Sequence, residues 1–232
     1  MKIAIMQPYF FPYIGYWQLV NEVDKFVIFD DVNFINKGWI NRNRILIDGE
    51  PRYINIQLKK ASQNKLIKET EVICDDVYNK KLLKTIETNY KKAPYFDSVY
   101  PLLADVITYK EENLSKFLVY SIKQICQYLS IDTEIIISSK LNKNSDLKGQ
   151  DKIIQMCKIL NTSEYYNTIG GQELYSYEDF RKENIVLKFL KSNCREYNQF
   201  NSKFVPDLSI IDVMMFNAKD NLSTRLNQFE LV

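Results

Sequence analysis

The 232-residue sequence contains no histidine, and this absence narrows the chemistry open to the protein. Serine–histidine–aspartate and cysteine–histidine mechanisms use an imidazole as the base, so both are excluded. Zinc sites of the H-E-x-x-H type are excluded for the same reason. Acid–base chemistry would fall to Asp, Glu, Lys, Tyr or Cys side chains, or to the substrate itself. An enzyme built on this chain would therefore work mainly by positioning and electrostatics.

Cysteine is scarce, and its spacing indicates reduced thiols. The chain has four cysteines and no C-x-x-C pair: Cys74, Cys126, Cys157 and Cys194. Disulfide frameworks and zinc sites use closely spaced cysteines, so neither is predicted, and we expect mostly buried free thiols. None of these cysteines has a histidine to activate it as a nucleophile.

Long apolar runs are also missing. No stretch approaches the length of a membrane span. The N-terminal apolar run is interrupted at Gln7, Pro8 and Pro12 and has no small-residue cleavage site, so a signal peptide is not predicted. Together with the free thiols, these features lead us to expect a cytoplasmic protein without a membrane span.

The charges nearly balance, with 31 Lys and Arg against 29 Asp and Glu. A net charge of +2 gives no field that would favour genomic nucleic acid or a membrane surface. Aromatic residues, in contrast, are abundant, with 16 tyrosines and 13 phenylalanines. Two interpretations stay open: an aromatic core, or a tyrosine-rich cleft for stacking on a sugar or base.

Short apolar runs alternate with helical patterns along the chain. Five buried strands are predicted at residues 2–6, 25–29, 134–137, 164–167 and 186–190. Helices are predicted at 15–22, 149–160, 177–183 and 210–217, with two or three more at 77–129, broken near Pro94 and Pro101. A hairpin is predicted from 45–47 and 53–58, joined by Asp48-Gly49.

This alternation indicates an open, mostly parallel, five-stranded α/β sheet with flanking helices and a helical insertion at about 77–129, all in one domain of residues 1–232. Ligand sites in such sheets lie beyond the carboxyl ends of the strands. The loops expected to carry a site are therefore 7–14, 30–44, 138–148, 167–171 and 191–206.

The first loop offers Gln7, Tyr9, Tyr13, Gly15 and Tyr16 ahead of a predicted helix. The free N–H groups at a helix start suit phosphate, and glycine lets a ligand approach the backbone. Tyr13-Ile14-Gly15-Tyr16 also resembles the H-x-G-H layout of nucleotidylyltransferase-like, Rossmann-like folds, with tyrosine at both histidine positions. The alternative interpretation is a glycine-containing turn with aromatic packing.

The second loop is polar and basic, and we expect it to be irregular. Its candidate ligand-binding residues are Asn33, Lys37, Trp39, Asn41, Arg42, Asn43 and Arg44. Arginine suits bidentate contact with phosphate, and asparagine suits sugar hydroxyls. A solvated basic face is the alternative.

Four further residues follow predicted strands or begin a helix. Asp30 and Asp31 follow the second strand, where a carboxylate could serve as general base or orient a hydroxyl; a helix cap or a salt bridge is the alternative. Lys148 could reach a phosphate or cap a helix, and Gly170 supplies backbone approach or a tight turn. No metal site is predicted.

Several blocks of the chain resemble the WbqC-like family: MQPYFFPYIGYWQLV, FVIFDDVNFINKGWINRNRI, LKGQDKII, IGGQELY and FVPDLSIIDVMMFN with its closing LNQFEL. The resemblance runs from the first residue to the C-terminus. Members of this family are encoded in bacterial O-antigen and related surface-polysaccharide gene clusters. The resemblance implies a role in making or decorating an activated sugar in the cytosol, and it carries no catalytic residue over.

The leading hypothesis is transfer of an acyl or aminoacyl group, such as glycyl, to the amine of a nucleotide-linked amino sugar. In it, Lys37, Arg42, Arg44 and the helix start hold phosphates, and Asp30 or Asp31 accepts the amine proton. No cofactor is identified; ATP or an acyl or aminoacyl donor would fit the reaction. The alternatives are a non-catalytic nucleotide-sugar-binding or assembly protein, and nucleic-acid binding through the basic segment 37–68. The oligomeric state is left open.

Overall fold

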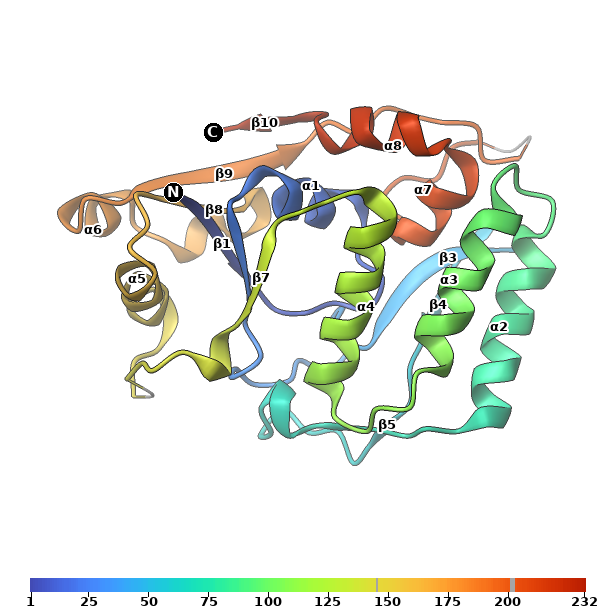
Figure 1. Cartoon of the computed structure of the whole chain (residues 1–232), viewed down its shortest axis with the longest axis horizontal. Coiled ribbons are helices and arrows are strands. Elements are labelled where there is room, and N and C mark those ends of the chain that lie inside the picture. Colours follow the sequence, from blue (N-terminus) through green and yellow to red (C-terminus); the bar gives the residue numbers. More distant parts are fainter. Residues whose placement is uncertain (145, 201–202) are drawn as a thin grey trace.

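The computed structural model describes residues 1–144, 146–200 and 203–232. Its main sheet has six strands in the order β10-β9-β8-β1-β2-β7 (Figure 1). The strands are β1 Lys2–Met6, β2 Lys25–Ile28, β7 Glu134–Ile137, β8 Glu164–Thr168, β9 Val186–Ser192 and β10 Phe229–Leu231. The first five pair in parallel, whereas β10 runs antiparallel to β9.

The predicted mixed, mostly parallel α/β sheet is confirmed, but the five-strand prediction was wrong because it omitted β10. This strand has three residues, too few for a periodic signal, and its pairing with β9 defines it. The C-terminal helix prediction was also incomplete. Two helices, α7 Ile210–Phe216 and α8 Lys219–Leu226, precede β10.

Helices cover both faces of the sheet because its strands are apolar on both sides. On β1, Ala4 joins the larger core cluster while Ile3 and Ile5 join the smaller one. The larger cluster contains buried residues of α1 Ile14–Glu22, α4 Leu114–Leu129, α7 and α8. The smaller contains those of α5 Gly149–Ile159 and α6 Tyr177–Lys182. The result is a three-layer α/β/α arrangement.

The long connection between β2 and β7 carries a hairpin and three helices. The hairpin strands are β3 Arg42–Ile47 and β4 Glu50–Asn55, so the predicted irregular loop ends earlier than expected. Asp48 and Gly49 form its turn with φ of 54° and 77°, as an Asp-Gly hairpin turn requires. Two short strands, β5 Leu58–Lys59 and β6 Glu71–Val72, flank the 3-10 turn η1 Ile67–Glu69.

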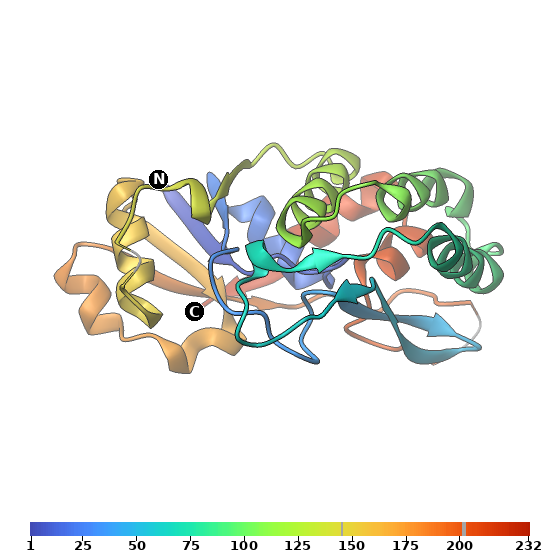
Figure 2. The ribbon, with the colours of Figure 1, turned by 90° about the horizontal axis from the view of Figure 1, so that it is seen from below.

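The three helices are α2 Asp76–Tyr90, α3 Phe96–Thr108 and α4. The expected break near Pro94 is present, but the break at Pro101 was wrong because Pro101 lies inside α3. The buried face of that helix, with Val99 and Leu103 on either side of the proline, continues through it. In Figure 2 these helices lie on one side of the molecule and the β3–β4 hairpin on the other. Across the described residues, no helix is both long and apolar enough to span a membrane.

The strand order reverses at β1. From β1 the chain adds β2 and β7 on one side, and it then returns to add β8 and β9 on the other. At the carboxyl ends of β1 and β8, the loops that follow these two strands therefore diverge. In open α/β sheets, such a reversal opens the crevice in which ligands bind.

Candidate functional site

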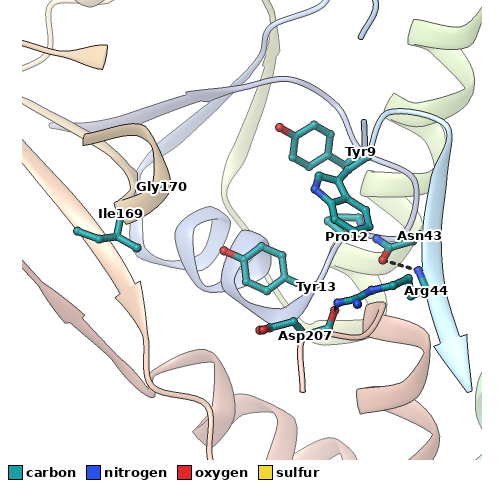
Figure 3. Close-up of a pocket in the computed structure, with 9 residues that line it drawn as sticks. Tyr9, Pro12, Tyr13, Asn43, Arg44, Ile169, Gly170 and Asp207 are labelled. Carbon is teal, nitrogen blue, oxygen red and sulfur yellow. Dashed lines mark hydrogen bonds between the residues drawn. The ribbon is translucent and has the colours of Figure 1, made fainter. Parts of the chain in front are cut away.

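A cavity of ≈ 410 Å³ lies beyond the carboxyl ends of β1 and β8, where the strand order reverses (Figure 3). This volume is within the range of roughly 300–1,000 Å³ typical of small-molecule sites. The cavity is lined by Tyr9, Pro12, Tyr13, Trp39, Asn43, Arg44, Ile169, Gly170 and Asp207.

The loop after β1 is held in place by hydrogen bonds to its main chain. The Asn43 side chain is buried and donates to the carbonyls of Phe10 and Phe11 at 3.1 and 2.8 Å. Ser209 Oγ donates to the Phe11 carbonyl from the opposite segment at 2.8 Å. Both phenylalanines are fully buried. The tyrosines on either side of them are thus presented to the cavity by a fixed backbone.

Gly15 makes room for an aromatic ring. A Cβ at this position would lie 2.5 Å from Cε2 of Tyr13, so the Tyr13 ring lies where the sequence analysis placed a ligand. Tyr16 is fully buried and donates to the Gln7 carbonyl at 3.3 Å. Gly15, Tyr16 and Gln7 therefore shape the wall behind Tyr9 and Tyr13, and they do not line the cavity themselves.

The tyrosine hydroxyls of this wall stay neutral. Burial raises the pKa of Tyr9 and Tyr13 above the ordinary value. The negative charge of nearby Asp207 raises the pKa of Tyr13 further. Both hydroxyls can therefore donate hydrogen bonds to a ligand over the physiological pH range.

Arg44 brings the positive charge to the cavity. Its Nη2 donates to the main-chain carbonyl of Asp207 at 3.3 Å, and its Cζ lies 5.8 Å from the centre of the Trp39 ring. Its Nε is buried and has no hydrogen-bond partner among the described residues. In Figure 3 the side chains of Arg44, Tyr13 and Asp207 lie close together on one side of the cavity, with Ile169 and Gly170 across from them.

Asp207 was missed by sequence reasoning, as were Pro12 and Ile169. Asp207 has a φ of 54°, a conformation that aspartate tolerates better than most side chains. In the part of the chain that the structure describes, no donor contacts its carboxylate. Two signals could have found it: the Pro-Asp pair in the C-terminal block of family resemblance, and the expected site loop 191–206, which ends one residue before Asp207.

The predicted basic loop is divided between two cavities. Trp39, Asn43 and Arg44 line the cavity at β1 and β8. Lys37, Asn41 and Arg42 line a second one beside the hairpin. Asn33 is exposed and lines neither.

Asp30 is occupied by structural contacts. It is 2% exposed and accepts hydrogen bonds from Ser115 Oγ, Ser139 N and Ser139 Oγ at 2.8, 3.0 and 2.8 Å. These bonds connect the end of β2 to α4 and to η2 Ser138–Lys140, which follows β7. Asp30 does not line the cavity.

Asp31 forms a largely buried ion-pair cluster. Its carboxylate lies 2.9 Å from Lys143 Nζ and 3.1 Å from Lys152 Nζ, and Ser138 Oγ donates to it. Burial raises the pKa of Asp31, but hydrogen bonds from Ser138 and the two lysines outweigh this effect, so the pKa is below its ordinary value. Asp31 thus holds the loop after β7 in place through Lys143, and it does not line the cavity.

Asp31→Asn is expected to lower the free energy of unfolding at pH 7 by about 2 kcal/mol, because charge-assisted hydrogen bonds are lost. The folded-state pKa is lowered, so the contribution is present above the unfolded pKa of about 3.9 and is lost as the pH falls through the folded value. Urea unfolding at several pH values measures this. A stability difference that stayed constant below pH ~4 would contradict the ion-pair assignment.

Gly170 and Lys148, the last two predicted site residues, lie apart. Gly170 follows β8 and lines the cavity, and a Cβ there would meet no atom within 4 Å. Lys148 is exposed and precedes α5 as its N-cap residue, away from the cavity lining.

No cysteine belongs to the described lining of this cavity. Burial raises the pKa of Cys126 and of Cys157 to about 12. Sγ of Cys194 lies 3.6 Å from Nη1 of Arg225, and Cys194 does not line the cavity. Over residues 1–144, 146–200 and 203–232, no group of three or more Cys, Asp or Glu side chains could hold a metal ion.

Comparison with known proteins identifies the family. The model of the WbqC-like protein family matches residues 7–224, a range that includes every residue of the cavity lining. The chain belongs to the WbqC-like protein family. The family resemblance predicted from the sequence is thereby confirmed.

One relative of this WbqC-like protein is the uncharacterized protein Rv1507c of Mycobacterium tuberculosis. It is 31% identical over 225 residues, which cover 94% of this chain and 94% of that protein. No solved structure matches this chain significantly.

Proposed function

We propose that this WbqC-like protein binds a nucleotide-activated amino sugar in the cavity at β1 and β8 and transfers an acyl or aminoacyl group, such as glycyl, to the sugar amine. The observation that carries the proposal is the meeting of Arg44 and Asp207 in one aromatic-walled cavity at the reversal of strand order. This strand order also supports a Rossmann-like sheet, in which nucleotides bind at that crevice.

Arg44 would hold a phosphate of the nucleotide. A guanidinium presents several N–H donors in a planar fork that matches phosphate oxygens. Among the described residues, only Nη2 of Arg44 has a hydrogen-bond acceptor, so the guanidinium keeps donor capacity for a ligand. Trp39 beside the guanidinium offers a surface for the base or the sugar ring.

Asp207 would accept the proton of the reacting amine. The amine nitrogen attacks the carbonyl carbon of an activated acyl donor, the new N–C bond forms, the leaving group departs with its electron pair, and the amine proton passes to the carboxylate. Asp30 and Asp31 are engaged by their own donors, so Asp207 replaces them in this role. Orientation of the amine supplies much of the rate, consistent with the absence of histidine.

Surface-polysaccharide assembly in the cytoplasm, including O-antigen, is the pathway that we propose. The family resemblance supports it, since these proteins are encoded in such gene clusters. ATP with a free amino acid, an acyl-CoA, or an aminoacyl-tRNA would each supply the activated acyl group. The test is incubation with UDP- or dTDP-amino sugars and each donor, followed by mass spectrometry. Absence of a mass gain on any sugar would refute the transfer.

Arg44→Gln is expected to weaken binding of a nucleotide sugar about 10- to 100-fold, because a charge-assisted contact to phosphate is lost. Isothermal titration calorimetry with UDP and dTDP sugars measures the change. Arg52→Gln is the matched control, since Arg52 is exposed on the neighbouring strand β4 and does not line the cavity. If both variants bound the nucleotide sugar with equal affinity, Arg44 would not be the residue that holds the phosphate.

A non-catalytic nucleotide-sugar-binding or assembly role is the second candidate. The engagement of Asp30 and Asp31 by structural contacts favours it, because it removes two of the carboxylates first considered for chemistry. This candidate predicts that cells carrying Asp207→Asn make an unchanged surface glycan. The transfer hypothesis predicts a glycan without the acyl group.

A further inference from the structure

The second cavity of the molecule lies beside the β3–β4 hairpin and has a volume of ≈ 660 Å³. We name it the amide groove, because four amide side chains line it: Asn36, Asn41, Asn55 and Gln57. The stretch 37–44 contributes to both cavities, so they lie on the two sides of one short segment.

The amides of the groove have unused hydrogen-bonding capacity. Asn41 and Asn55 each donate to the Ile56 carbonyl at 3.3 Å, and no donor among the described residues reaches their side-chain oxygens. The Asn36 and Gln57 side chains make no hydrogen bond to any described residue. Because an amide offers both donors and an acceptor, four of them together suit a ligand that is rich in hydroxyl groups.

The apolar part of the groove includes an exposed aromatic ring beside Phe34, Ile56, Leu58, Ala61 and Ile73. Tyr53 lines it and is 51% exposed. The Arg42 guanidinium lies over the Tyr53 ring, 4.2 Å from its centre, and the Trp39 ring lies 6.2 Å away, centre to centre. Because half of Tyr53 is still exposed, a sugar ring can stack its apolar face on the part of the ring that Arg42 leaves open while its hydroxyls reach the surrounding amides.

Two cations line the groove, and one of them is engaged by its own loop. Arg42 already donates to the carbonyls of Gly38 and Lys37, so its guanidinium is engaged by the loop. Lys37 is the remaining cation of the lining, and no carboxylate is present among the described lining residues.

We propose that the amide groove is a second binding site, which takes a pyranose ring of a neutral carbohydrate stacked on Tyr53 and hydrogen-bonded by the four amides. This site extends beyond the proposed function and does not rest on it. A sugar can bind here whether or not the cavity at β1 and β8 performs a transfer.

Saturation-transfer NMR tests the groove with a panel of neutral mono- and disaccharides that covers hexoses, 6-deoxyhexoses and N-acetylhexosamines. We expect at least one sugar of the panel to bind, and substitutions of Tyr53 and Gln57, which line the groove and not the other cavity, assign the binding to the groove. Tyr53→Ala is expected to weaken binding about tenfold through loss of stacking. Gln57→Ala should also weaken it without removing any internal hydrogen bond.

Tyr177→Ala is the matched control, because Tyr177 is also exposed, at 42%, and begins α6 on another part of the surface. Its sugar affinity should equal that of the wild type. The proposal is overturned if no sugar of the panel binds, if both groove variants bind normally, or if heparin or single-stranded RNA binds there and the sugars do not. If no sugar bound in the amide groove but a nucleotide sugar still bound at Arg44, the proposed function would be unaffected.

Discussion

Asp207→Asn is expected to lower the rate of amine acylation by about 100-fold or more, because the amine loses its proton acceptor. The fold should be unaffected. Asparagine tolerates the φ of 54° found at this position, and the main-chain carbonyl that accepts from Arg44 is retained. Product formation at saturating nucleotide sugar, followed by mass spectrometry, measures the rate.

Asp48→Asn is the control for this substitution. Asp48 has the same φ of 54° and is exposed in the β3–β4 turn, where it does not line the cavity. It should acylate at the wild-type rate. If Asp207→Asn were equally fast, the base would be another group. If it lost nucleotide-sugar binding at an unchanged saturated rate, Asp207 would position the sugar and would not accept the proton.

Asp30→Ala is expected to act on stability and not on the reaction, lowering the free energy of unfolding by about 2–4 kcal/mol. Its removal leaves the buried hydroxyl of Ser115 without an acceptor, whereas water can replace the acceptor of the exposed Ser139. An unsatisfied buried donor costs about 1–3 kcal/mol, and the exchanged bonds of Ser139 add less. Thermal and urea unfolding measure the loss, and the folded fraction should retain its acylation rate per molecule.

Asp132→Ala provides the comparison for Asp30, since Asp132 is exposed and makes no side-chain hydrogen bond to a described residue. Its stability should stay within about 0.5 kcal/mol of the wild type. If the Asp30→Ala protein were stable but inactive, Asp30 would take part in the reaction, and its structural assignment would be wrong.

Much of the fold is readable from the sequence because the parallel strands are buried on both faces and form short apolar runs. Runs such as KIAIM and KFVIF need no tertiary information to be recognised. β10 could not be predicted in this way, since its three residues extend the sheet by pairing with β9. Pro101 misled the prediction because a buried helical face outweighs the local effect of the proline.

The site was predicted less well, because residue type does not reveal which partners a side chain has. Asp30 follows a strand, as a catalytic carboxylate would, yet serine donors from α4 and from the end of β7 surround it. Arg42 and Arg44 read alike in the sequence, but one is bonded within its own loop and the other lines the cavity. Asp207 joins them only through the fold, from the other end of the chain.

The connection between β2 and β7 also affects the order in which the molecule assembles. These neighbouring strands are separated by residues 29–133, whereas β1 and β2 are joined by a single helix. Closing a long segment costs more chain entropy before its contacts form, and distant pairings slow folding. We therefore expect β7, at the edge of the sheet, to pair with β2 after β1 and β2 have paired. During synthesis, the amide groove can form before the cavity at β1 and β8, because the lining of that cavity includes Asp207 near the C-terminus.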